Sequence, residues 1–135
     1  MTITEQKVAQ RKAGIAARRA LSDTERTHSN AALCARIMAL DCFKKAENIL
    51  LYAAFGGEAD LSALAVEAAR QGKTLAYPVC GEGFSLTAAV PGPDGWEVGT
   101  YGIRTPILSR SAVLPPDKLD LVLVPCTAFD AACRR

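Results

Sequence analysis

The sequence predicts an α/β fold in which a mainly parallel sheet carries helices on both faces. Two short apolar runs, residues 48–53 and 73–79, have the composition of strands that are buried on both sides. Between them, apolar residues recur at helical spacing over 61–68. A strand, a helix and a second strand within about 30 residues form a βαβ unit, whose strands run parallel. The apolar run 119–125 predicts a further strand of the same sheet.

Two helices are expected before the first strand. Residues 4–20 are rich in Ala, Lys, Arg and Gln, which favour a helical backbone. Residues 22–25, Ser-Asp-Thr-Glu, have the pattern of a capping box, in which a hydroxyl and a carboxylate satisfy free backbone N–H groups. The helix that starts there carries Leu33, Ile37 and Leu40 at helical spacing. The sequence therefore predicts a pair of helices that precede the first strand of the sheet.

Caps and turns divide the rest of the chain. Asp60 is suited to cap the helix between the first two strands, and Gly72 is suited to end it. Residues 84–90 predict a third strand, and the Pro- and Gly-rich stretch 91–95 predicts a turn. Because neither a linker nor a repeat separates these segments, residues 1–135 are expected to form a single domain.

Composition limits the class of protein. The chain has 135 residues, of which 50% are hydrophobic and 22% are charged, as in globular domains. Its net charge of +2 lacks the basic excess of nucleic-acid-binding domains. It contains no apolar run of about 18 residues that could span a membrane, and residues 1–10 lack the apolar segment of a signal peptide. We therefore expect neither a nucleic acid nor a membrane as a partner.

The cysteines indicate a reducing compartment and not a metal site. Five cysteines are widely scattered without a CxxC pair, and the chain has one histidine. This inventory does not supply the usual ligands of a zinc site. We therefore expect no zinc site, and we expect most of the cysteines to be small buried side chains in a cytoplasmic protein.

Candidate ligand-binding residues follow the predicted strands. In parallel α/β sheets, ligands bind beyond the carboxyl ends of the strands, and the loops 53–60, 78–83 and 125–135 lie there. In the first loop, Glu58 is either a carboxylate that accepts N–H groups of a polar ring or an acid in the turn before the helix. In the last loop, Asp130 is either a ligand carboxylate or a loop cap.

Cationic and aromatic side chains form a second group of candidates. Lys7 and Arg11 stand four residues apart, so they share a helix face, and Arg18 falls close to the same stripe. Such a face is either a phosphate-binding surface, since Lys and Arg offer several donors to phosphate oxygens, or a solvated basic surface. Trp96 and Tyr101 are either cover for the sheet or stacking surfaces for a flat ligand.

Five segments of the chain share the motifs of one family. They are Lys7-x-x-x-Arg11 with Arg18–Ser22, Phe55–Asp60, Gly72–Val79, Tyr101–Pro106, and Leu119–Pro125 with Ala128–Asp130. In this order they resemble the 5-formyltetrahydrofolate cyclo-ligase family, also called the 5,10-methenyltetrahydrofolate synthetases. The resemblance implies a three-layer, Rossmann-like fold of the NagB/RpiA/CoA-transferase type. It also implies an ATP- and Mg²⁺-dependent ligase of folate one-carbon metabolism.

The activity implied by the resemblance is the cyclisation of 5-formyltetrahydrofolate to 5,10-methenyltetrahydrofolate, with release of ADP and phosphate. Phosphorylation of the formyl oxygen makes it a leaving group, and N10 then attacks the activated carbon. Matching motif positions assign three contacts to each substrate. The ATP contacts are Lys7, Arg11 and Arg135, and the folate contacts are Ala53, Glu58 and Tyr101. No catalytic residue and no metal ligand is assigned.

The chain departs from the family pattern near its end. In the family, the stretch that resembles residues 130–135 leads into a Gly-rich Tyr-Tyr-Asp loop, whereas here Cys133 stands where the family has Gly and the sequence stops at Arg135. We therefore expect a C-terminally incomplete domain whose strand 121–124 is uncovered and available for oligomerisation. Two alternative functions stay open, a catalytically inactive folate-binding relative and a non-enzymatic α/β interaction module.

Overall fold

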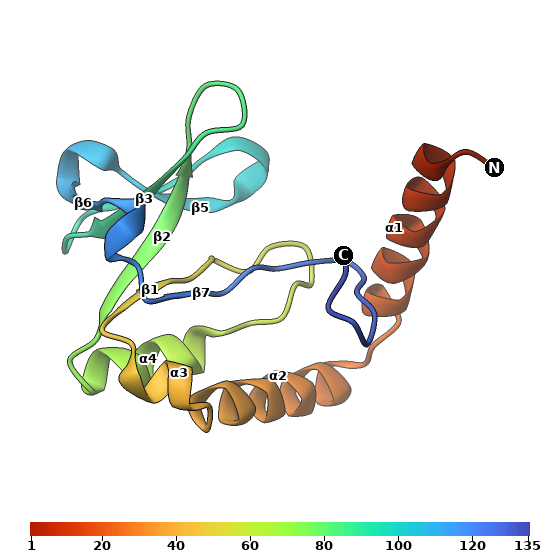
Figure 1. Cartoon of the computed structure of the whole chain (residues 1–135), viewed down its shortest axis with the longest axis horizontal. Coiled ribbons are helices and arrows are strands. Elements are labelled where there is room, and N and C mark those ends of the chain that lie inside the picture. Colours follow the sequence, from red (N-terminus) through yellow and green to blue (C-terminus); the bar gives the residue numbers. More distant parts are fainter.

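The computed structural model describes residues 1–135 and confirms the α/β class (Figure 1). The helices are α1 (Ile3–Arg19), α2 (Asp23–Met38), α3 (Asp41–Lys45) and α4 (Ser62–Arg70). The strands are β1 (Asn48–Leu50), β2 (Thr74–Cys80), β3 (Leu86–Pro91), β4 (Trp96–Val98), β5 (Arg104–Pro106), β6 (Ser111–Leu114) and β7 (Leu121–Val122). Three short 3₁₀ turns are η1 (Thr100–Gly102), η2 (Leu108–Arg110) and η3 (Pro116–Lys118). None of the helices combines the length and the apolar character that crossing a bilayer requires.

The main sheet has five strands in the order β6-β3-β2-β1-β7. β1 pairs in parallel with β2 and β7, whereas β3 pairs antiparallel with β2 and β6. Four of the five strands therefore point the same way and only β3 is reversed, as a mainly parallel sheet requires. The reversal follows from the short connection 81–85, because so few residues can join only antiparallel neighbours. β4 and β5 form a separate antiparallel pair.

Side-chain caps start both N-terminal helices. The Thr2 hydroxyl accepts the backbone N–H of Glu5 at 3.2 Å, and Glu5 Oε2 accepts the N–H of Thr2 at 2.7 Å. The Ser22 hydroxyl accepts the N–H of Glu25 at 3.1 Å, which confirms the predicted start of the second helix. These contacts satisfy donors that have no partner within the helix. The sequence pattern does not reveal α3, because a helix of about one turn is too short to show periodicity.

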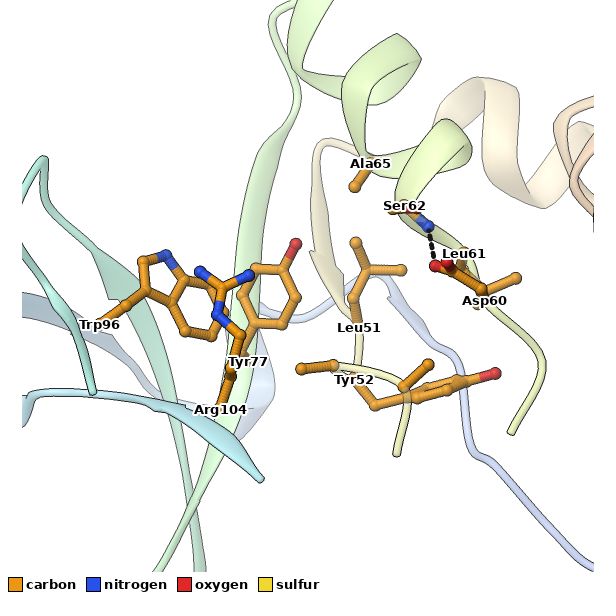
Figure 2. A pocket seen from close by; sticks show the side chains of 11 residues that line it. Leu51, Tyr52, Asp60, Leu61, Ser62, Ala65, Tyr77, Trp96 and Arg104 are labelled. Atoms are coloured by element: carbon orange, nitrogen blue, oxygen red, sulfur yellow. Dashed lines mark hydrogen bonds between the residues drawn. The ribbon is translucent and has the colours of Figure 1, made fainter. Parts of the chain in front are cut away.

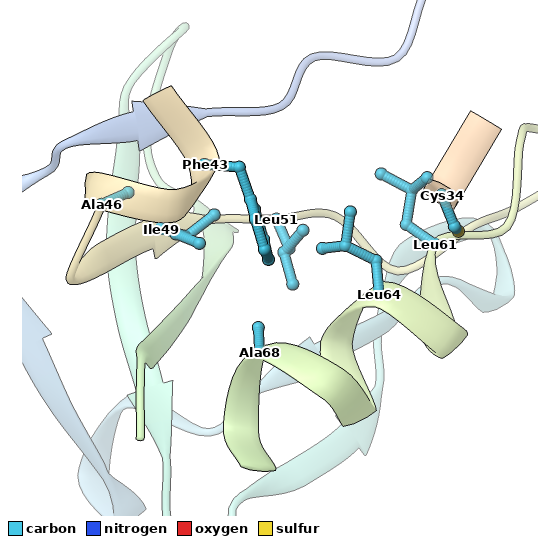
Figure 3. Packing of buried hydrophobic residues seen from close by; sticks show 8 residues of the cluster. All are labelled: Cys34, Phe43, Ala46, Ile49, Leu51, Leu61, Leu64 and Ala68. Carbon is cyan, nitrogen blue, oxygen red and sulfur yellow. The ribbon is translucent and has the colours of Figure 1, made fainter. Parts of the chain in front are cut away.

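The hydrophobic core lies between three helices and one face of the sheet (Figure 3). Its buried members are Cys34, Phe43, Ala46, Ile49, Leu51, Leu61, Leu64 and Ala68. They come from α2, α3 and α4 and from the segments around β1 and before α4, so these helices cover this face (Figure 1). Side chains alternate along a strand, and on the opposite face Val122 and Val124 are 48% and 55% exposed. Within residues 1–135, helices therefore pack on one face of β7, and the face that carries Val122 and Val124 has no helix on it.

The expectation that most cysteines are buried is wrong. Only Cys34 is buried, whereas Cys42, Cys80, Cys126 and Cys133 are exposed, and all five are free thiols. Position explains the difference. The exposed cysteines lie on the short helix α3, at the last residue of β2 and in the segment after β7, and none of these side chains belongs to the core.

Candidate functional site

A cleft of about 510 Å³ lies between α1 and the segment that follows β7. We call it the basic cleft, because its charged lining consists of Lys7, Arg11, Arg18, Arg135 and Glu58. The structure thus brings together Glu58 and all three predicted ATP contacts. Figure 1 shows the C-terminal segment running beside the end of α1 that leads into α2. Four cations against one carboxylate make the cleft suited to a polyanion.

The face of α1 that lines the cleft is set by residue spacing. Lys7, Arg11 and Arg18 are separated by four and seven residues, so they point to the same side of the helix. Gly14 lies among them, and a Cβ at this position would overlap the carbonyl oxygen of Thr127. Gly14 therefore permits the close approach of α1 to the segment after β7. These two elements form the sides of the cleft.

Glu58 is both a turn residue and a cleft residue. Its backbone N–H donates to the Phe55 carbonyl at 3.1 Å, and its Oε1 accepts the Phe55 N–H at 2.9 Å. Gly56 and Gly57 lie between them with φ of 60° and 81°, a backbone region that glycine adopts without strain. The interpretation of Glu58 as an acid in a turn is thus confirmed, and the same side chain lines the basic cleft.

Arg18 is a cleft residue that the sequence places near the stripe of Lys7 and Arg11, although it is not among the three predicted ATP contacts. Its Nε is buried and has no hydrogen-bond partner in the chain. Arg26 fixes the backbone nearby, since its Nη2 donates to the Arg18 carbonyl at 2.9 Å and its Nη1 donates to the Gly57 carbonyl at 3.3 Å. A buried donor without a partner is costly, and the Arg18 Nε lies beside Gly57 of the Glu58 turn. The only sequence signal for the place of Arg18 in the cleft is its spacing from Arg11.

A tight loop leads to Arg135. Asp130 Oδ1 accepts the backbone N–H groups of Ala132 at 2.9 Å and Arg134 at 3.0 Å, and Oδ2 accepts Arg134 Nε at 2.7 Å. The hydrogen bonds from the Arg134 backbone and side chain hold the pKa of Asp130 below its ordinary value. Asp130 is therefore a loop cap. Cys133, which stands where the family resemblance has Gly, adopts a φ of 60° in this loop.

A second, mostly apolar cavity of about 280 Å³ is lined by the two ends of the segment 52–60, at residues 52–54 and at Asp60 (Figure 2). We call it the aromatic cavity, because Tyr52, Tyr77 and Trp96 line it together with Arg104. The rings of Tyr77 and Trp96 meet edge to face, with centroids 4.7 Å apart and an interplanar angle of 70°. This arrangement of rings suits a planar ligand.

The two tyrosines of the aromatic cavity stay protonated near neutral pH. Burial, with the nearby charge of Glu58 as a smaller cause, raises the pKa of Tyr52 to about 12. Its hydroxyl donates to the Ala59 carbonyl at 2.8 Å. Burial also raises the pKa of Tyr77. Both phenols are thus hydrogen-bond donors in a largely apolar site.

The predicted folate contacts fall in different places. Ala53 lines the aromatic cavity, whereas Glu58 lines the basic cleft, so the segment 52–60 forms a wall that both sites share. Tyr101 lines neither site, and its side chain is 83% exposed in η1, so its role stays a prediction. Sequence reasoning did not find Tyr77 or Arg104, because only the packing of β5 against β2 places them together.

The residues present do not form a metal-binding group of their own. No three His, Cys, Asp or Glu side chains are arranged so that they could hold a metal ion. Glu58 is the single carboxylate that lines the basic cleft, and its Oε1 already accepts the Phe55 N–H. The donors of this chain therefore do not fit a protein-held Mg²⁺.

Comparison with known proteins relates this arrangement to a family. The family model of the 5-formyltetrahydrofolate cyclo-ligase family matches residues 3–135. The NMR structure of a 5,10-methenyltetrahydrofolate synthetase from Aquifex aeolicus is similar to this chain, with a TM-score of 0.79 and 31% sequence identity. A 5,10-methenyltetrahydrofolate synthetase from Mycoplasma pneumoniae gives a TM-score of 0.71 at 18% identity, which supports the fold alone. Among curated proteins, none matches the sequence.

The two solved structures are longer than this chain. The Aquifex aeolicus alignment covers 92% of this chain and 62% of that protein. The Mycoplasma pneumoniae alignment covers 91% of this chain and 65% of that protein. This chain therefore spans less than two thirds of the length of either relative.

Proposed function

Because the chain belongs to the 5-formyltetrahydrofolate cyclo-ligase family, we propose that it binds ATP and 5-formyltetrahydrofolate and forms 5,10-methenyltetrahydrofolate, ADP and phosphate. The observation that carries this proposal is the wall formed by residues 52–60. Its residues 52–54 and Asp60 line the aromatic cavity, and its Glu58 lines the basic cleft. A triphosphate and a folate ring bound at these two sites meet at the same loop.

The basic cleft would bind the triphosphate. A formamide oxygen is a poor leaving group, and ATP supplies the phosphoryl group that makes it one before N10 attacks. Phosphoryl transfer depends mainly on positioning and on positive charge around the phosphate oxygens. Lys7, Arg11, Arg18 and Arg135 offer that charge from two different parts of the chain.

The wall and the aromatic cavity would orient the folate. Glu58 Oε1 accepts the Phe55 N–H, and a carboxylate has further acceptor sites for the polar N–H groups of a pterin. Tyr52 and Tyr77 supply ring surface beside the pterin, and Tyr77 also supplies a protonated hydroxyl group, since the Tyr52 hydroxyl donates to the Ala59 carbonyl.

The activity is tested by the ATP-dependent growth of methenyltetrahydrofolate absorbance from 5-formyltetrahydrofolate. Replacement of Lys7 or Arg11 by Ala should weaken ATP binding about tenfold or more, because each removes a charge-assisted hydrogen bond to phosphate. Lys12→Ala is the matched control, since Lys12 is exposed on the same helix and does not line the cleft. Unchanged ATP affinity in the Lys7 and Arg11 variants would reject the phosphate-binding role.

The same measurements separate the alternative functions. Folate binding without an absorbance signal would favour a catalytically inactive folate-binding relative. If the chain binds neither ATP nor folate but specifically retains a protein partner, an interaction module would be favoured. The absorbance signal itself would exclude both.

A further inference from the structure

Arg104 is held at the aromatic cavity by its place in the β4–β5 pair. In this pair Val98 lies opposite Arg104, and Trp96 lies opposite Pro106. Trp96 and Arg104 are therefore diagonal neighbours on one face of the pair, a spacing that long side chains can bridge. The Arg104 Cζ lies 4.6 Å from the centroid of the Trp96 ring, within the range of a cation–π contact. The guanidinium is thus oriented before any ligand binds.

The hydrogen-bond donors of Arg104 are free. Its guanidinium forms neither a salt bridge nor a hydrogen bond within the chain, whereas Arg26 and Arg110 donate to backbone carbonyls. The contact with Trp96 is a cation–π contact and occupies no hydrogen-bond acceptor, so the guanidinium N–H groups stay available to a ligand. A carboxylate is the partner that matches this planar fork of donors.

The rest of the cavity indicates what kind of molecule carries that carboxylate. Figure 2 shows Arg104, Trp96 and Tyr77 on one side of the cavity and Asp60 on the other. The Asp60 carboxylate accepts the Ser62 N–H at 2.9 Å, so one of its oxygens is engaged just before α4, although the N-cap of this helix is Leu61 and not Asp60 as the sequence predicts. A volume of about 280 Å³ is at the lower end of ligand sites, and holds about one ring. The site therefore fits an aromatic ring that carries a carboxylate at its outer end.

We propose that Arg104 binds a glutamate carboxylate of the folate substrate, and so determines specificity for substrates with an acidic tail. This inference rests on the proposed function. The p-aminobenzoyl ring then occupies the aromatic cavity beside Tyr77 and Trp96, and the pterin lies toward the wall that carries Glu58. N10 joins the two ring systems, so it comes to lie at the boundary with the basic cleft.

The test compares 5-formyltetrahydrofolate with its dimethyl ester, which has the same rings and neutral tail groups. Trp96 is the single tryptophan of the chain, so its fluorescence reports binding at this cavity. The unmodified chain should bind the diacid at least about tenfold more tightly than the diester, as expected for a hydrogen-bonded ion pair. Arg104→Gln should reduce this preference to within about twofold by weakening the diacid alone.

Two controls make the outcome decisive. Arg36→Gln removes the same charge from an exposed position on α2 and should keep the full preference. Unchanged affinity of Arg104→Gln for the diester shows that the cavity is still folded. If Arg104→Gln keeps the preference, this inference is overturned while the proposed function stands. If the unmodified chain binds neither ligand and shows no turnover, the proposed function fails and this inference fails with it.

Discussion

Tyr101 has a backbone conformation that bulky side chains rarely adopt. Its φ of 61° lies in the left-handed region, which costs a non-glycine residue about 1–2 kcal/mol. Residues held in such conformations occur preferentially at functional sites, and the Tyr101 ring is 83% exposed. The backbone strain and the exposure of Tyr101 together agree with a ring that contacts a ligand and does not pack in the core.

Replacing Tyr101 by Gly should have opposite effects on stability and on binding. We expect the free energy of unfolding to rise by up to about 1 kcal/mol, because glycine relieves the backbone strain. We expect folate affinity to fall if the ring contacts the substrate. Chemical denaturation and fluorescence titration measure the two quantities, with Tyr101→Phe as the control that keeps the ring. Folate affinity equal to that of the unmodified chain would remove Tyr101 from the site.

Asp130 predicts a pH dependence of the loop that carries Arg135. Its pKa in the folded chain is lower than its ordinary value, mainly because the Arg134 backbone and side chain donate to it. The carboxylate therefore stabilises the loop fully above its ordinary pKa, and this stabilisation is lost as pH falls through the lowered pKa. The amide NMR signals of Ala132 and Arg134 should shift together during acid titration. Asp130→Asn should abolish that shift, and its persistence would assign the titration to another group.

At the scale of elements, α4 shows how the core depends on helix periodicity. Leu64 is fully buried among core residues, whereas Val66 on the same helix is 73% exposed. Leu64→Ala should lower the free energy of unfolding by about 2–5 kcal/mol, because it removes packing and leaves a cavity. Val66→Ala should change it by no more than about 0.5 kcal/mol. Urea denaturation compares the two, and equal effects would contradict this assignment of the buried face.

The elements that the sequence predicts well are those with strong local signals. The cap at Ser22, the stop at Gly72 and the two parallel strands are all present. β1 ends at Leu50, earlier than the predicted run 48–53, and the last hydrogen bond from this run to β2 is the one that the Leu51 N–H donates to the Ala76 carbonyl at 2.8 Å. Apolar composition shows which residues avoid water, but it does not show where the ladder of hydrogen bonds stops.

At the scale of the whole molecule, the uncovered face of β7 predicts self-association. Val122 and Val124 are both about half exposed on the side opposite the core, and oligomerisation through them stays a prediction. Val122→Lys together with Val124→Lys should weaken any self-association about tenfold or more, since burying the new charges is costly. Sedimentation velocity over a range of concentrations measures this, with Val66→Lys as the control. A monomer at every concentration of the unmodified chain would refute the prediction.

The candidate site was only partly accessible to sequence reasoning. Spacing places Lys7 and Arg11 on one helix face, loop position makes Glu58 a candidate, and the family resemblance adds Arg135, which lines the same cleft. The aromatic cavity was not predicted, because Tyr77 belongs to the main sheet while Trp96 and Arg104 belong to the separate β4–β5 pair. No spacing along the chain encodes how one pair of strands packs on another.

The wall shared by the two sites has a thermodynamic consequence. Residues 52–60 contribute to both proposed ligand sites, and the Gly56–Gly57 turn within them is held only by hydrogen bonds at an exposed surface. The first ligand to arrive must restrict the loop, and the second finds it already ordered, so binding should be cooperative. Linkage then requires that nucleotide tighten folate binding by the same factor by which folate tightens nucleotide binding.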